Sequence, residues 1–221
     1  MSSSSFKHDL FTRFAEVGKA LSNGNRLELL EFLAQGERSV EDLATVSGLT
    51  VANTSRHLQQ LRQAGLILNR KEGLKVFYRI SDDDVIELLN ALRTVAGRHV
   101  ADVERLVNTY LTVKDNLEPV PRDELLARVQ DDLVTVIDVR PAEEYAAGHI
   151  PGAANIPLSE LEKHLDQFDP EQEIVAYCRG PHCILAFDAV ARLREKGYMA
   201  RRLQDGFPEW KSAGLPVKQS F

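Results

Sequence analysis

The stretch SVEDLATVSGLTVANTSRHLQQLRQAGLILNRKEGLKVFYRI, residues 39–80, decides the fold of the first half of the chain. A serine-x-x-aspartate pattern beginning at Ser39 resembles a capping box and predicts a helix that ends at Gly48. Thr50 can cap a second helix, which stops at Gly65. Two short β-type runs with a glycine between them then predict a hairpin. Two helices around a tight turn, followed by a hairpin, predict an α+β winged helix-turn-helix domain.

The second helix and the hairpin carry side chains suited to DNA. Major-groove base edges call for polar, bidentate side chains, and phosphates call for basic ones. Residues 51–80 hold six lysines and arginines against one acidic residue. A solvated helix with ordinary surface charge is the alternative, and the capped helix, turn and basic hairpin in sequence favour DNA. The candidate DNA-binding residues are Asn53, Thr54, Ser55, Arg56, Gln59, Gln60, Arg62, Arg70, Lys71, Lys75 and Arg79, while Val51, Leu58, Leu61 and Leu66 are expected to face the core.

Helical patterns flank this stretch on both sides. Residues 11–21 and 26–36 have apolar residues at helical spacing, and residues 81–113 form a long pattern with an acidic start. One apolar stripe of the long pattern is suited to pairing with a second copy of the chain, and it consists of Val85, Leu88, Leu89, Leu92 and Val95.

Pro119 and Pro121 interrupt the helical pattern and mark a linker. We therefore expect a first domain at 1–115 and a second at 116–221. The first is electrically neutral, so the net charge of −6 resides in the second. The second half alternates strands with helices, which predicts an α/β domain with a largely parallel central sheet. Its expected strands are 133–140, 154–157, 173–178 and 199–206, and its expected helices are 141–149, 158–168, 184–197 and 207–214.

The segment AYCRGPHCILA, residues 176–186, holds both cysteines of the chain. A strand before Cys178 and a helix after Cys183 would place a sulfur among backbone N–H groups at a helix N-terminus, where a thiolate is stabilised. The neighbouring arginine adds positive charge. Zinc would need more ligands than this loop supplies, so no metal is expected, and two inert buried cysteines are the other alternative. The candidate catalytic residues are Cys178, Arg179, Gly180, Pro181, His182 and Cys183.

Two family resemblances follow from these motifs. ALSNGNRLELLEFLAQGERSVEDLATVSGLTVANTSRHLQQLRQAGLILNRKEGLKVFYRIS resembles the ArsR-type repressors, over roughly residues 6–112. The resemblance implies a homodimer, paired through the first and last helices, on a pseudo-palindromic double-stranded operator. Many members sense metals through cysteines before the recognition helix, or through acids and histidines on the last helix. Here ERSVEDLA has no cysteine and the last helix offers only His99, so neither metal site is expected.

VIDVRPAEEYAAGHIPGAANIP and LQDGFPEWKSAGLPV resemble the rhodanese sulfurtransferases, over about residues 119–219. The resemblance implies that Cys178 takes sulfur from a donor such as thiosulfate or polysulfide and carries it as a transient persulfide, with no other cofactor. The amides of residues 179–183 would cradle that sulfur, and Asp138 and Arg140 would form a supporting ion pair. Related phosphatases have a Cys-x5-Arg loop, and Ile184 stands at that arginine position. Cys183 departs from the family pattern and could attack a modified Cys178, so a disulfide stays open.

The combined sequence predicts a DNA-binding transcriptional regulator that senses reactive sulfur or redox state through Cys178. A working sulfurtransferase merely fused to a DNA-binding module is the alternative, and an inactive interaction module is a third. Whether the chain is an enzyme stays open. An N-terminus without an apolar segment, and no run of about 18 apolar residues, predict a soluble cytoplasmic protein without a membrane partner.

Overall fold

The computed structural model describes residues 3–131 and 133–220. The chain forms two compact units, Met1–Leu89 and Asn90–Phe221, and the division falls within helix α5 (Asp84–His99). The predicted domain boundary at 115/116 lies later in the chain and stays a prediction. Among the helices of residues 3–131 and 133–220, none combines the length and the hydropathy of a membrane span.

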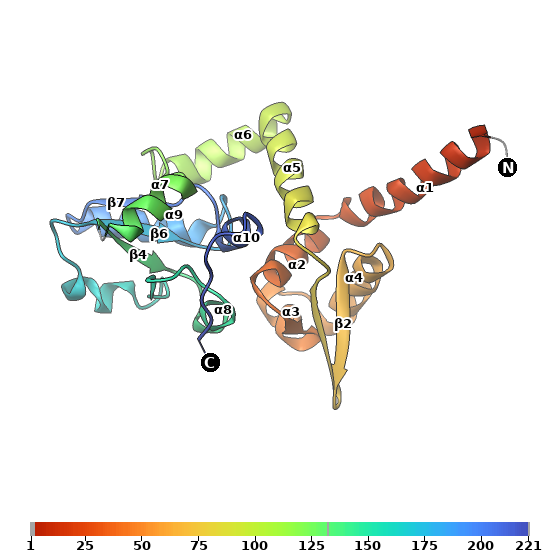
Figure 1. Ribbon diagram of the computed structural model, residues 1–221, viewed down its shortest axis with the longest axis horizontal. Helices are drawn as coiled ribbons and strands as arrows, with labels where there is room; N and C mark the ends of the chain where they lie inside the picture. The colour runs from red at the N-terminus through yellow and green to blue at the C-terminus, as the bar shows by residue number, and fades with distance from the viewer. Residues whose placement is uncertain (1–2, 132, 221) are drawn as a thin grey trace. The chain divides into compact units, whose positions relative to one another are not determined.

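The first unit contains the predicted helices and hairpin (Figure 1). The Ser39 hydroxyl accepts the Asp42 amide at 3.1 Å, and the Asp42 carboxylate accepts from Ser39 in return, which confirms the capping box. Thr50 caps the next helix by accepting the Asn53 amide. The elements are α1 (Ser3–Leu21), α2 (Gly24–Gln35), α3 (Val40–Ser47), α4 (Val51–Gln63), β2 (Ile67–Glu72) and β3 (Lys75–Ile80).

A third strand, β1 (Arg38–Ser39), pairs antiparallel with β3, so the order of this sheet is β1-β3-β2. Two residues are too few to give a period-two pattern, which is why the sequence did not predict β1. Gly73 turns the hairpin with a φ of 59°, a left-handed conformation that favours glycine. Between the sheet and the helices lies a core that includes Leu29, Leu30, Leu43, Leu58, Leu61 and Ile67.

The long helix predicted over residues 81–113 is interrupted. Helix α5 ends at His99, Val100 is extended with φ −108° and ψ 98°, and α6 (Ala101–Val107) begins after it. A π-helical turn, η1 (Asn108–Thr112), follows. A β-branched valine just after Gly97 and His99 is a weak point in a helix, which accounts for a break that a periodic apolar pattern does not reveal.

The second unit is built on a four-stranded sheet in which all three pairings are parallel and the strand order is β5-β4-β6-β7. The predicted parallel sheet is therefore confirmed. Its strands are β4 (Val134–Asp138), β5 (Ala154–Asn155), β6 (Glu173–Tyr177) and β7 (Ala200–Arg202). The helices of this unit after η1 are α7 (Arg122–Gln130), α8 (Ala142–Ala147), α9 (Ile184–Glu195) and α10 (Phe207–Ser212).

Two local predictions differ from this structure. Helix α7 was not predicted, because the prolines before it suggested only a linker. The helix expected at 158–168 is instead two short 3-10 turns, η2 (Leu161–Lys163) and η3 (Leu165–Gln167). Leu161 is the buried residue of these turns, so a single anchor in the core replaces the continuous apolar face that stabilises a longer helix.

Alternate residues of β4 and β6 belong to two different cores. Ile137 and Ala176 pack in one cluster together with Cys178, whereas Val136 and Tyr177 pack in the other. This alternation buries both faces of the sheet. It also places Cys178 on the face that packs against α9.

Candidate functional site

The two cysteines stand at opposite ends of the loop between β6 and α9. Cys178 directly follows β6 and is buried, and Cys183 is the N-cap residue of α9. Their sulfur atoms form a disulfide, and their Cα atoms lie 6.2 Å apart. That separation falls within the range over which cysteines can be bridged, a point that spacing in the sequence does not decide.

Backbone hydrogen bonds hold this loop. The Cys183 amide donates to the Gly180 carbonyl at 3.1 Å, within the loop, and the Phe207 amide donates to the Cys178 carbonyl at 3.0 Å. In the disulfide state, the Cys183 amide is therefore not turned toward a sulfur. The cradle of amides expected over 179–183 stays a prediction for the reduced loop.

Arg179, the arginine next to Cys178, pairs with an acid on α8. The Arg179 Nη2 donates to the Glu144 Oε1 at 2.8 Å, and the Glu144 side chain is fully buried. Glu144 therefore compensates the positive charge that the sequence assigned to the loop through Arg179. Glu144 was not among the predicted site residues, because its position four residues after Arg140 gives no sign of this contact.

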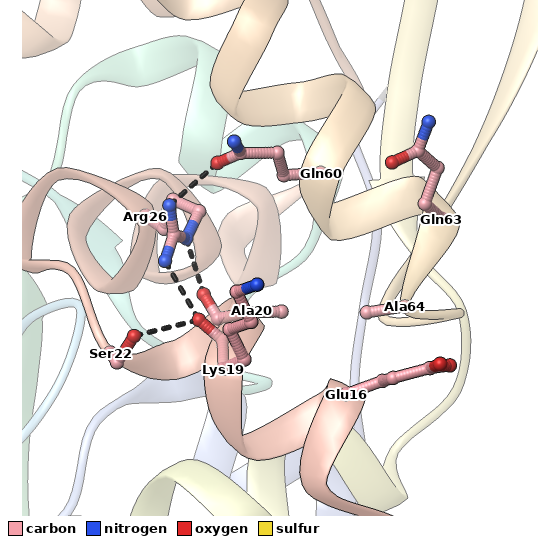
Figure 2. A pocket seen from close by; sticks show the side chains of 8 residues that line it. All are labelled: Glu16, Lys19, Ala20, Ser22, Arg26, Gln60, Gln63 and Ala64. Carbon is pink, nitrogen blue, oxygen red and sulfur yellow. Dashed lines mark hydrogen bonds between the residues drawn. The ribbon is translucent and has the colours of Figure 1, made fainter. Parts of the chain in front are cut away.

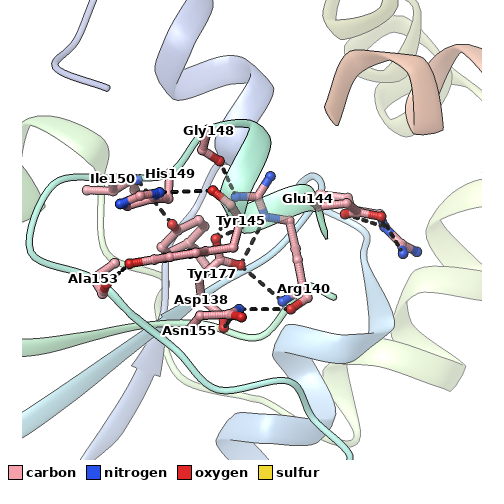
Figure 3. A network of polar contacts seen from close by, with 11 residues as sticks. Asp138, Arg140, Glu144, Tyr145, Gly148, His149, Ile150, Ala153, Asn155 and Tyr177 are labelled. Atoms are coloured by element: carbon pink, nitrogen blue, oxygen red, sulfur yellow. Dashed lines mark hydrogen bonds and ion pairs between the residues drawn. The ribbon is translucent and has the colours of Figure 1, made fainter. Parts of the chain in front are cut away.

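Asp138 and Arg140 form the predicted ion pair, and both side chains are fully buried. The Arg140 Nε donates to the Asp138 Oδ1 at 2.9 Å, and its Nη2 donates to the Gly148 carbonyl at 2.8 Å (Figure 3). Burial lowers the pKa of Arg140, but the hydrogen bonds and charge of Asp138 outweigh it and raise that pKa above its ordinary value. The pair joins the end of β4 to the segment after α8.

Further polar contacts tie the same segment to β6, as Figure 3 shows. The Ile150 amide donates at 3.1 Å to the hydroxyl of Tyr177, the residue before Cys178. Burial, together with the Asp138 carboxylate, raises the pKa of Tyr177 well above its usual value, so the phenol stays neutral. The Asn155 side-chain Nδ2 donates to the backbone carbonyls of Asp138 and Arg140. The base of the cysteine loop is thus fixed by a buried polar network.

The recognition helix α4 exposes most of its predicted DNA-contacting residues. Asn53, Arg56, Gln59, Gln60 and Arg62 are exposed and Ser55 is partly buried. Thr54 differs, because it is fully buried and its hydroxyl donates to the Thr50 carbonyl at 3.0 Å. The structure therefore places Thr54 in the core. Val51, which was expected in the core, is half exposed at 50%. Both residues lie in the first turn, where the helical stripe is least defined.

Arg26 on α2 connects the end of α1 to the recognition helix (Figure 2). Its Nη1 donates to the Gln60 Oε1 at 2.6 Å, and its Nη2 donates to the Lys19 carbonyl at 2.8 Å. These residues line a cavity of about 480 Å³, which Glu16 and Gln63 also border. Arg26 thereby orients a side chain predicted to meet DNA, a role that its sequence position does not indicate.

The basic residues of the hairpin are not equivalent. Arg70 pairs with Glu37 and Glu72, and its guanidinium lies 4.7 Å from the centre of the Phe77 ring. Lys71, Lys75 and Arg79 are exposed. Because two carboxylates compensate Arg70, the other three supply the net positive charge of the hairpin.

We expect Lys71→Ala to weaken binding to random-sequence duplex DNA and to flatten its salt dependence. The slope of log affinity against log salt is negative, and each lost phosphate contact reduces its magnitude by about 0.9. Arg70→Ala is the matched neighbour, and it should change the slope less because Glu37 and Glu72 already compensate that charge. Fluorescence anisotropy over a salt series measures both slopes. Equal slopes for the two variants would contradict this assignment.

The fold and the site define a winged-helix DNA-binding protein joined to a domain with a cysteine-bearing strand–loop–helix. Family models match both parts: "Bacterial regulatory protein, arsR family" at residues 23–68 and "Rhodanese-like domain" at residues 121–213. The HTH-type transcriptional regulator Rv0324 of Mycobacterium tuberculosis is 46% identical over 213 residues, covering 96% of this chain and 93% of that protein. The chain belongs to the arsR family of transcriptional regulators and carries a C-terminal rhodanese-like domain.

Solved structures resemble each half separately. A solution structure described as a homodimeric winged helix-turn-helix DNA-binding domain from Mycobacterium bovis is 43% identical and covers 45% of this chain and 93% of that one, with a TM-score of 0.42. A rhodanese-related protein from Thermoplasma volcanium is 25% identical and covers 46% of this chain and 98% of that one, also with a TM-score of 0.42. Within residues 3–131 and 133–220, no three His, Cys, Asp or Glu side chains are grouped to hold a metal ion.

Proposed function

We propose that this regulator senses sulfane sulfur through Cys178 and converts the signal into a change of operator affinity. The observation that carries the proposal is the pairing of Cys178 with Cys183 across one loop, with Cα atoms 6.2 Å apart. A sulfurtransferase needs only one cysteine, whereas a switch needs two states that persist. The second cysteine supplies such a state.

The chemistry balances with a persulfide or polysulfide as the oxidant. The Cys178 thiolate attacks the outer sulfur of a donor R–S–SH, forming Cys178–S–SH and releasing RS⁻. The Cys183 thiolate then attacks the Cys178 sulfur, forming the Cys178–Cys183 disulfide and releasing HS⁻. The donor sulfur is reduced to hydrosulfide while two thiols become a disulfide. A cellular thiol can reverse the change by exchange.

We propose that a homodimer binds a pseudo-palindromic operator. The apolar side chains exposed on α1 and α5 support this, because a single chain leaves them in water: Phe6, Leu10, Phe11, Phe14, Leu88, Leu92 and Val95. The Mycobacterium bovis relative is described as a homodimer. A chain that binds the operator acts where the DNA is, in the cytoplasm.

Operator affinity with and without polysulfide tests the proposal. The full chain first selects its operator from a random duplex pool under reducing conditions. We expect polysulfide to change the affinity of the wild-type dimer by at least about fivefold, the lower end of ordinary coupling between two sites, and to leave Cys178→Ser unchanged. A Cys178→Ser protein that still responds would refute sensing at this residue.

The rhodanese-like match at residues 121–213 also favours a working sulfurtransferase. That second candidate predicts sustained turnover of thiosulfate with cyanide, together with operator binding indifferent to sulfur donors. The same pair of measurements therefore separates a sensor from a fused enzyme.

A further inference from the structure

One positive charge beside the middle of the cysteine loop belongs to Arg93, which is far away in the sequence. Arg93 and the loop both lie within the unit Asn90–Phe221. A Cβ placed on Gly180 would lie 3.9 Å from both the Nη1 and the Nη2 of Arg93. A side chain at Gly180 would therefore touch the guanidinium, which faces the open side of this glycine two residues after Cys178.

Glu209 on α10 holds this guanidinium. The Arg93 Nη1 lies 2.8 Å from the Glu209 Oε1 and 3.1 Å from the Asn90 Oδ1. The Glu209 side chain is only 4% exposed, and burial raises its pKa while the Arg93 charge opposes that rise. A buried carboxylate with a bonded cation is a fixed anchor, since removing either partner leaves an uncompensated charge.

The same carboxylate is bonded to the backbone that supports the loop. The Glu209 Oε2 accepts the Gly206 amide at 3.0 Å. Gly206 packs so closely on the loop that a Cβ there would lie 2.3 Å from the Gly180 nitrogen, so no other residue fits. The next amide, of Phe207, donates to the Cys178 carbonyl at 3.0 Å. Hydrogen bonds and close packing thus connect the first half of the loop to the turn at Gly206, and through it to Glu209 and Arg93.

We propose that Arg93 is a positioning residue whose positive charge stabilises negative charge on the sulfur of Cys178. Glu209 holds the Arg93 guanidinium in position and offsets part of its positive charge. This rests on the proposed function, in which the thiolate and the persulfide of Cys178 are both anions. Arg179 is the candidate that the sequence suggests, and each arginine is paired with a buried acid, Arg179 with Glu144 and Arg93 with Glu209. Arg93 differs in facing the open side of Gly180. An opposite charge near a titrating group favours the charged form of that group.

The test is the pH profile of Cys178 alkylation by iodoacetamide, in the full chain and without sulfur donor or DNA. Cys183→Ser is the background, so that Cys178 is the one remaining thiol. We expect Arg93→Gln to raise the apparent pKa of the thiol by about one unit, which slows alkylation near neutral pH by up to about tenfold. The rate at the alkaline plateau should not change. Arg93→Lys, which keeps the charge, should restore most of the profile.

Glu209→Gln gives the sharpest contrast, because it removes a negative charge and keeps an acceptor oxygen. We expect it to lower the apparent pKa of Cys178, opposite in sign to Arg93→Gln. Arg98→Gln, on the exposed part of the same helix, is the control and should leave the profile unchanged. A purely structural role would move both variants in the same direction, or move the plateau instead of the midpoint. Either result, or no shift in Arg93→Gln, would overturn the proposal. None of these outcomes depends on whether operator binding responds to sulfur.

Discussion

Asp138→Ala is expected to destabilise the rhodanese-like domain by about 3–5 kcal/mol, because it leaves the Arg140 guanidinium buried without its counter-charge. Both side chains are fully buried in the native state. The Gly148 carbonyl would remain as an acceptor for Arg140, but a neutral carbonyl does not compensate a full charge. The loss is large against the total stability of an ordinary domain.

Urea unfolding followed by tryptophan fluorescence measures this loss. The chain has a single tryptophan, Trp210, which is buried in the rhodanese-like domain, so the signal reports on that domain. Asp102→Ala is the matched control. Asp102 also pairs with an arginine, at 3.0 Å, but both partners are about three-quarters exposed, and such pairs contribute little.

The milder Asp138→Asn variant keeps an acceptor oxygen and should lose less stability, which covers the case in which Asp138→Ala does not fold. Replacing both Asp138 and Arg140 by apolar residues of similar volume should recover most of the loss, because no charge is then left buried. If Asp138→Ala unfolds at the same urea concentration as Asp102→Ala, the buried Asp138–Arg140 pair does not stabilise the domain as expected.

Cys183→Ser is expected to change the product of the sulfur reaction completely. Reduced wild-type protein treated with a persulfide donor should end as the Cys178–Cys183 disulfide, lighter than the reduced chain by two hydrogen atoms. Reduced Cys183→Ser should stop at the persulfide, heavier by a sulfur atom, because no second thiol lies within bridging distance of Cys178.

Intact-mass spectrometry of the treated proteins distinguishes these products. Cys178→Ser is the control and should gain neither change, since the proposed reaction assigns the attack on the donor to Cys178 and gives Cys183 only the second step. A Cys178→Ser protein that collects sulfur on Cys183 would reverse the two roles. A stable persulfide on the wild-type protein would show that the Cys178–Cys183 disulfide does not form in this reaction.

Local chemistry in the sequence determined the helices and the hairpin of the first unit, but not β1, and the alternation of strands and helices in the second unit, but not α7. The cap at Ser39, the cap at Thr50 and the glycine turn at Gly73 act within a few residues, so the helices and the hairpin could be predicted. The alternation of strands and helices in the second half likewise predicted a parallel sheet. The Asp138–Arg140 pair could be proposed from its resemblance to a known motif, and the structure shows it.

Only the tertiary structure decided which side chains meet. Thr54 turned inward because its hydroxyl bonds the previous turn, a choice that its polarity does not reveal. Arg179 pairs with Glu144, and Arg93, remote in the sequence, faces the open side of Gly180. These contacts join residues distant in the chain, and no local pattern encodes them. The reach of Cys183 to Cys178 depends in the same way on how β6, the loop and α9 are placed by their packing.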